Sequence, residues 1–126
     1  MKDITVLPDI TIRQAMKKLS QSGEKCLVIV DENDRLLGTL SDGDLRKAIL
    51  KGASVGDSIS NTYQRKPAIL VEGRYRLDDA RKLFTKNKFD LIPVVDAQGR
   101  VADILLWETV LQSEKNRKTE TLNAPV

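Results

Sequence analysis

The chain contains no histidine, and this absence removes the commonest general base and the commonest metal ligand. Histidine-based catalytic triads and metal sites are therefore excluded. The remaining residues supply no paired nucleophile, poised base or metal-binding cluster. We therefore expect no catalytic residues in this segment, and neither a metal nor a required cofactor.

Cysteine and aromatic residues are also scarce. The one cysteine, Cys26, stands inside an apolar run at residues 26–30, which is typical of a buried thiol in a reducing compartment. Aromatic residues make up 4% of the chain, and the net charge of +3 is spread along it. A nucleic-acid site needs stacking rings or a clustered basic face, so we expect no nucleic-acid partner.

Long apolar runs are missing as well. None approaches the roughly 18 residues of a membrane span, and the first residues, Met1 to Asp3, carry charge without a signal-peptide core. We therefore expect no membrane contact and a cytoplasmic location. With 126 residues, of which 40% are hydrophobic, the chain has the length of one domain and can bury a core.

What the chain does contain is an internal repeat with an offset of 65 residues. The shift places Ala15 on Ala80 and Val30 on Val95 without a gap. The other identical pairs include Ile4 with Ile69, Val6 with Val71, Lys17 with Lys82, Asp31 with Asp96, Arg35 with Arg100 and Leu40 with Leu105. Two copies are too few for a solenoid, so we expect them to pack together as one pseudo-symmetric body.

Hydrophobic periodicity gives each copy the order strand, helix, strand, strand, helix. The first copy predicts strands at 4–7, 27–30 and 36–40, a helix between Thr11 and Gly23, and a second helix from Ser41 or Asp42 to residue 51. The second predicts strands at 69–71, 91–95 and 101–106, with helices over 77–84 and from residue 107. The fold class is therefore α+β, with two β-α-β-β-α repeats packed with pseudo-twofold symmetry.

Local signals refine this plan. Thr11 and Gln14 fit a capping box, and the residues expected to turn inward on the helices of the first copy are Ile12, Ala15, Met16, Leu19, Leu45, Ala48 and Ile49. Pro93 lacks an N–H and indicates an edge strand or a local break in pairing. We assign residues 1–60 to the first repeat with its connector, 61–112 to the second repeat, and 113–126 to a tail. The connector predicts at most a short helical turn at 55–59.

The segment from Gly38 to Leu45 has the character of a ligand site. A strand ends, a glycine allows close backbone approach, and a helix begins at Ser41 with Asp44 three residues on. An ionised aspartate can accept bonds from both hydroxyls of a vicinal diol, and a helix start favours a phosphate. The same spacing also forms a helix cap, and spacing alone favours that structural interpretation.

The doubled unit, with Gly38-Thr39-Leu40-Ser41-Asp42-Gly43-Asp44 after its second hairpin strand, resembles the CBS domain, and two in tandem resemble a Bateman module. The resemblance covers about residues 1–112. It implies a regulatory module that binds an adenosine nucleotide (AMP, ADP or ATP) or S-adenosylmethionine and forms a homodimer. Residues 36–50 and 104–108 are further similar to the CBS pair that precedes some bacterial sugar-phosphate nucleotidyltransferase domains, which implies an attached catalytic domain.

The resemblance also implies the site residues. Asp44 would hold the ribose hydroxyls, Ser41 would face the ribose or phosphate, and Ile69 and Leu91 would flank the base. The second repeat would supply Lys66 to Ile69 and Asp90-Leu91, with Lys66 as the phosphate-binding cation and Arg46 or Lys47 as alternatives. The full expected set is Gly38, Thr39, Leu40, Ser41, Asp44, Lys66, Ile69, Asp90 and Leu91.

The second copy lacks this motif. At the positions of Gly38, Ser41 and Asp44 it has Asp103, Leu106 and Thr109. Leucine offers no acceptor and threonine no carboxylate, so we expect at most one nucleotide per chain.

Trp107 follows the degenerate segment and is expected to anchor a core or an interface rather than to stack on a base. An apolar face near Trp107, together with the lost motif, leaves open an alternative function. The chain could be a dimerisation or assembly module that binds no ligand.

Overall fold

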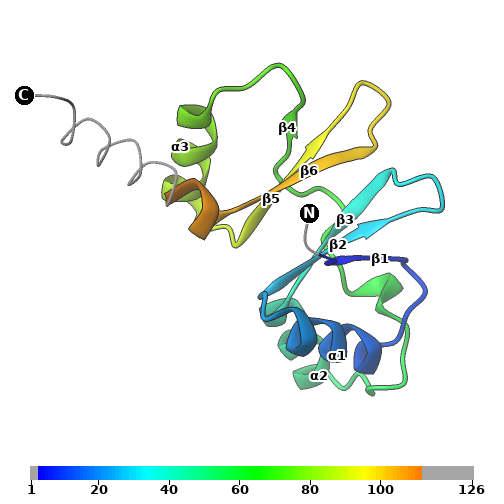
Figure 1. Ribbon diagram of the computed structural model, residues 1–126. Coiled ribbons are helices and arrows are strands. Elements are labelled where there is room, and N and C mark those ends of the chain that lie inside the picture. The colour runs from blue at the N-terminus through cyan, green and yellow to red at the C-terminus, as the bar shows by residue number, and fades with distance from the viewer. Residues whose placement is uncertain (1–2, 112–126) are drawn as a thin grey trace, which may run out of the picture.

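The order of helices and strands follows the predicted repeat (Figure 1). The structure, a computed structural model, describes residues 3–111; the predicted tail and residue 112 of the second repeat lie outside the described residues. The first repeat comprises β1 (Thr5–Val6), α1 (Ile12–Ser22), β2 (Cys26–Val30), β3 (Leu36–Ser41) and α2 (Asp42–Leu50). A 3₁₀ turn, η1 (Ile59–Asn61), leads to β4 (Leu70–Val71), α3 (Leu77–Asn87), β5 (Leu91–Val95) and β6 (Val101–Leu106), and a further helix begins at residue 107.

Each repeat forms a three-stranded sheet with the same strand order. β2 lies between the parallel β1 and the antiparallel β3, and β5 lies in the same way between β4 and β6. The registers agree after a shift of 65 residues, since Val28 faces Thr39 and Pro93 faces Ile104. All residues of the two central strands are buried, as expected of apolar strands covered on both faces. The predicted repeat and the α+β class are confirmed.

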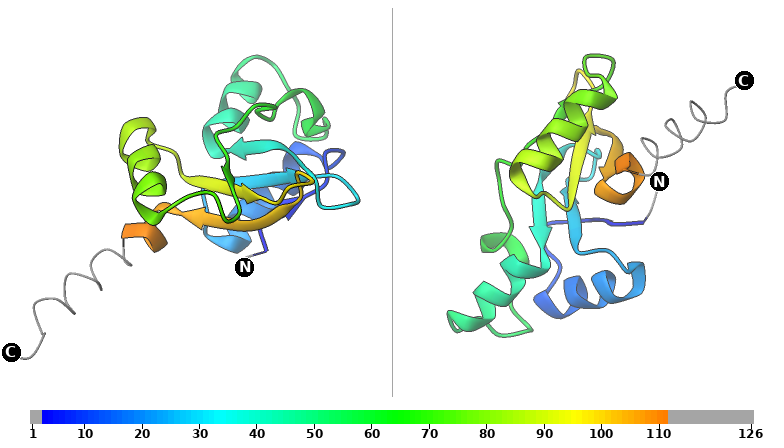
Figure 2. Two further views of the ribbon diagram at one scale, coloured as in Figure 1. Left: turned by 90° about the horizontal axis from the view of Figure 1, so that it is seen from above. Right: turned by 90° about the vertical axis from the view of Figure 1, so that its left-hand side faces the viewer.

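The two repeats meet through their hairpins, which lie next to each other in Figures 1 and 2. Leu36 donates its N–H to the Gly99 carbonyl at 2.9 Å, and Val101 donates to the Asp34 carbonyl at 2.8 Å. Adding 65 to the residues of the first bond, or subtracting 65, turns it into the second. The predicted pseudo-twofold relation is therefore present in the hydrogen bonds that join the two halves.

The apolar core also crosses the boundary between repeats. The larger cluster of buried side chains belongs to the first repeat but includes Leu91 of β5, and Ile104 and Leu106 of β6 pack against it. A smaller cluster in the second repeat contains Ala80, Phe84, Ile92 and Val110. Because the halves share apolar contacts, the space between them is held in place by the core.

Local sequence signals explain how α1 begins and ends. Thr11 and Gln14 form the predicted capping box: the Gln14 N–H donates to Thr11 Oγ1 at 3.1 Å, and the Thr11 N–H donates to Gln14 Oε1 at 2.9 Å. Gly23 ends the helix with φ at 72°, a conformation that glycine adopts without strain. Both predictions are confirmed.

Several predicted inward positions are wrong. Met16 is 43% exposed and Ile49 is 38% exposed, because Ile12, Ala15 and Leu19 already fill the inward face of α1 and Leu45 alone is fully buried on α2. The connector also makes its short helical turn at η1, later than predicted, and α3 continues to Asn87. Within residues 3–111, no helix is long and apolar enough to cross a membrane.

Pro93 lies in the central strand β5, so its predicted edge position is wrong. The alternative, a local break in pairing, is confirmed by comparison with the first repeat. There the equivalent residue, Val28, donates its N–H to the Ile4 carbonyl at 2.8 Å. Proline has no N–H for the matching bond to Ile69, so β5 keeps its hairpin partner but loses one link toward the chain before β4.

Candidate functional site

A cavity of about 390 Å³ lies between the two repeats. Its walls come from β2, β3 and the start of α2 in the first repeat, from the connector, and from the start of β5 in the second repeat. The lining residues are Cys26, Thr39, Ser41, Asp44, Gln64, Lys66, Pro67, Ala68, Phe89, Asp90 and Leu91. Of the expected site residues, the structure therefore brings together Thr39, Ser41, Asp44, Lys66, Asp90 and Leu91.

Ser41 and Asp44 form the helix cap that their spacing allows. The Asp44 N–H donates to Ser41 Oγ, and the Ser41 N–H donates to Asp44 Oδ2, both at 3.0 Å. The cap uses one Asp44 oxygen, and within residues 3–111 the other oxygen, Oδ1, has no protein donor. Since an ionised carboxylate has about four acceptor positions, the cap orients Asp44 on the cavity wall and leaves it able to accept further hydrogen bonds.

The charged groups on the cavity are of both signs. Lys66 contributes an ammonium group, and Asp44 and Asp90 contribute carboxylates. Burial raises the pKa of Asp90 above its ordinary value; nearby Lys25 opposes this shift, and Asp42 and Glu24 add to it. Asp90 is therefore the acid on this wall for which the charged form is disfavoured.

Cys26 also lines the cavity, although its sequence context predicted only a buried residue. Burial, followed by the charges of Asp90 and Asp44, raises the pKa of its thiol to about 12. The thiol is therefore protonated at neutral pH, and the thiolate that would act as a nucleophile is not available. The prediction of an inert buried cysteine is consistent with this environment.

Gly38, Leu40 and Ile69 do not line the cavity. A Cβ atom on Gly38 would overlap the Gln64 carbonyl oxygen and come within 2.6 Å of the Tyr63 ring, so glycine is required for the connector to pass. Leu40 is fully buried in the core, and Ile69 is exposed beside the cavity. Gly38 thus acts on the site indirectly, because it sets the position of the connector that carries Lys66.

The alternative phosphate-binding cations are placed elsewhere. Arg46 and Lys47 are exposed on α2 and do not line the cavity. Arg46 also forms an ion pair with Asp42, with its Nη2 atom 3.3 Å from Asp42 Oδ2. Of the basic residues considered from the sequence, Lys66 alone lies on the cavity.

The equivalent place in the second repeat is smaller and less polar. A cavity of about 160 Å³ there is lined by Leu106, where the first repeat has Ser41, and by Trp107. The Trp107 ring packs against Phe84 with centroids 5.4 Å apart, and this contact joins it to the second core. Trp107 therefore serves the core, as predicted, while one part of it borders this small cavity.

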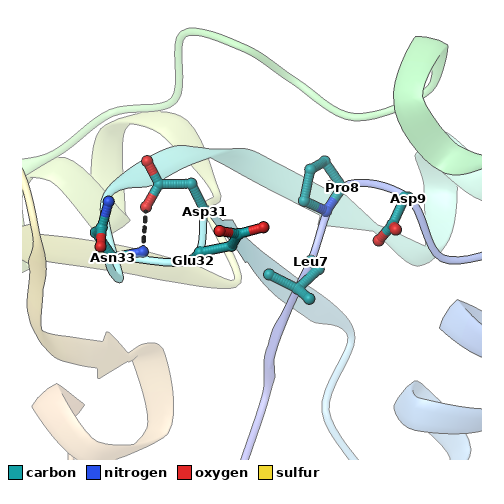
Figure 3. A pocket seen from close by; sticks show the side chains of 6 residues that line it. All are labelled: Leu7, Pro8, Asp9, Asp31, Glu32 and Asn33. Carbon is teal, nitrogen blue, oxygen red and sulfur yellow. Dashed lines mark hydrogen bonds between the residues drawn. The ribbon is translucent and has the colours of Figure 1, made fainter.

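A third hollow, of about 370 Å³, lies beside the turn between β2 and β3 (Figure 3). Its acidic side chains are Asp9, Asp31 and Glu32, and no basic residue lines it. The Asp31 carboxylate already accepts the N–H of Asn33 at 2.8 Å. This hollow is unsuited to an anionic ligand. Within residues 3–111, no group of three or more acidic or cysteine side chains is placed to hold a metal ion.

Comparison with known proteins identifies the architecture. The CBS domain family model matches residues 1–51, which is the first repeat. The crystal structure of CBSX2 from Arabidopsis thaliana in complex with AMP superposes with a TM-score of 0.78 at 28% identity, and covers 90% of this chain and 88% of that one. The chain is a tandem CBS domain pair. The predicted family and fold are confirmed.

Curated relatives place such CBS pairs within longer proteins. Inosine-5'-monophosphate dehydrogenase from Aquifex aeolicus is 25% identical over 89% of this chain, which spans 22% of that protein. Arabinose 5-phosphate isomerase GutQ from Salmonella typhimurium is 30% identical over 82% of this chain, which spans 32% of it. Neither is a nucleotidyltransferase, so an attached domain of that kind stays a prediction.

Proposed function

We propose that this CBS pair is a regulatory module that binds an adenosine nucleotide in the 390 Å³ cavity. The observation that carries the proposal is the convergence of Ser41, Asp44, Lys66 and Leu91, from both repeats, on one cavity. The presence of AMP in the related CBSX2 structure supports this ligand class.

The cavity offers a partner for each part of the ligand. Asp44 Oδ1 accepts the ribose hydroxyls, while the helix cap holds the carboxylate in place. The Lys66 ammonium group and the first turn of α2 attract the phosphate. Leu91 supplies apolar contact for the base, and Ile69 lies close enough along the chain to join it.

Regulation follows from the shared site. A ligand that contacts both repeats stabilises the arrangement of repeats in which its contacts are complete, and shifts the population toward it. The attached domain that would read this shift is a further proposal, and a sugar-phosphate nucleotidyltransferase was the domain expected from the sequence. The segment itself acts as a sensor and carries no catalytic residues in this scheme.

Isothermal titration calorimetry with AMP, ADP, ATP and S-adenosylmethionine tests the proposal. Asp44→Ala should abolish or strongly weaken nucleotide binding. Asp79→Ala is the matched control, because Asp79 accepts the Arg76 N–H at 2.9 Å at the start of α3 and lies outside the cavity. Both variants lose a helix cap worth about 1 kcal/mol, but only Asp44→Ala should lose binding. Equal affinities in the two variants, or no binding at millimolar nucleotide, would refute a nucleotide sensor.

The alternative of a ligand-free assembly module keeps one supporting observation. Leu50 on α2 is 80% exposed, and Met16 on α1 is also exposed. Apolar side chains on two neighbouring helices could be covered by a second copy of the chain. Sedimentation of the full chain at high micromolar concentration tests this function, and a purely monomeric result would exclude it.

A further inference from the structure

The two repeats differ at the point where their first strands meet their central strands. In the first repeat, the bond from the Val28 N–H to the Ile4 carbonyl holds Ile4 in the core, where it is 1% exposed. In the second repeat, Pro93 takes the place of Val28 and has no N–H to donate. Its partner in the chain, Ile69, is 44% exposed.

This difference leaves a segment of the connector without backbone support. Within the described chain, no backbone hydrogen bond joins residues 65–69, here called the strap, to any other residue. The strap is fixed at its first end by Gln64, which exchanges two backbone bonds with Thr39 at 2.8 and 3.0 Å. At its other end Leu70 begins the pairing of β4 with β5.

The strap also forms one wall of the nucleotide cavity. Lys66, Pro67 and Ala68 line the cavity, and Ile69 follows directly outside it. A segment held only at its ends can move without breaking the sheet, and segments with few backbone bonds belong to the low-stability end of a protein. The strap is therefore the wall of the cavity that can change position at least cost.

We propose that Pro93 is a positioning residue that keeps the strap unpaired, so that the strap closes over a bound nucleotide and Ile69 covers the ligand. This inference rests on the proposed function. Closure gives Ile69 the apolar contact that Ile4 finds in the core, and this gain is available only when a ligand supplies the opposite surface. Pairing of the strap with β5 would bury Ile69 against the protein and remove this gain.

Hydrogen exchange of the full chain, measured with and without saturating AMP, tests the motion directly. The strap amides should exchange rapidly in the free protein and at least tenfold more slowly with AMP bound. The amides of β1, the equivalent strand in the first repeat, should show no comparable change. AMP binding without slower exchange in the strap would overturn the strap proposal and leave the nucleotide site intact. No AMP binding by the wild type would instead overturn the proposed function.

A pair of equivalent substitutions separates ligand contact from stability. Ile69→Ala should weaken AMP binding about tenfold, since covering one exposed aliphatic side chain contributes roughly this much, and should hardly change the melting temperature. Ile4→Ala should lower the melting temperature strongly and leave the affinity of the folded protein unchanged. An Ile69→Ala variant with wild-type affinity would contradict closure of Ile69 on the ligand.

Pro93→Val tests the cause of the open strap. The variant restores the residue that the first repeat has at this position, so its N–H can bond the Ile69 carbonyl. We expect weaker AMP binding without a lower melting temperature, together with slower exchange at residue 93 than at neighbouring exposed sites. Wild-type AMP affinity in a variant with a protected amide at residue 93 would refute the role of Pro93.

Discussion

Replacing Gly38 by alanine should destabilise the protein, although the added group is a single methyl. The new Cβ would overlap the Gln64 carbonyl oxygen and lie 2.6 Å from the Tyr63 ring. Backbone cannot rotate away as a side chain can, so the connector must shift. This shift would break the two backbone bonds between Thr39 and Gln64.

The magnitude follows from these contacts. Overpacking typically costs 1–3 kcal/mol, and each lost backbone bond adds roughly 0.5–1.5 kcal/mol. We therefore expect Gly38→Ala to lower the free energy of unfolding by about 2–4 kcal/mol, which corresponds to a melting temperature lower by roughly 10 °C. Because the connector carries Lys66, nucleotide affinity should fall as well.

Gly43→Ala provides the matched control. Gly43 lies in the first turn of α2, and the nearest atom to a Cβ there is Ser41 Oγ at 3.6 Å, an ordinary contact distance. Alanine at this position should stabilise the helix by roughly 0.5 kcal/mol. Urea unfolding of both variants is the assay. If Gly38→Ala were as stable as Gly43→Ala, the close approach of the connector to β3 would be wrong.

Two further predictions concern charges on the cavity. Lys66→Ala should weaken AMP binding roughly fivefold and leave adenosine binding unchanged, since an exposed ammonium contributes about 1 kcal/mol to a phosphate contact; Lys47→Ala is the control, and an equal loss for adenosine would contradict phosphate binding by Lys66. Asp90→Asn should raise the melting temperature at pH 7. Burial raises the pKa of Asp90, so its contribution to stability is largest below the ordinary aspartate pKa and is lost as pH rises through the raised value. The gain from Asp90→Asn should therefore vanish near pH 3, and a gain that is constant with pH would show that charge is not the cause.

The parts of the structure that depend on neighbouring residues could be predicted from the sequence. The capping box of Thr11 and Gln14 and the stop at Gly23 are set within a few residues of chain, and the repeat offset carried the strand registers from one half to the other. Helical periodicity was less informative at the border of a face. It could not separate Met16, on the flank of α1, from the buried residues beside it.

The cavity wall shows the same division. Ser41 and Asp44 could be predicted from their spacing, but Gln64 and Phe89 lie on the cavity through contacts between distant segments. One missed residue had a usable signal. Cys26 is the repeat equivalent of Leu91, so the expected place of Leu91 on the site also implied Cys26 under pseudo-twofold symmetry.

The most direct test of the central claim is a crystal structure of the full chain grown with AMP. The account predicts one nucleotide per chain between the repeats, with its ribose hydroxyls within hydrogen-bond distance of Asp44 Oδ1 and its phosphate near Lys66. Nucleotide density beside Trp107 or in the acidic hollow of Figure 3, with Asp44 making only its helix cap, would contradict it.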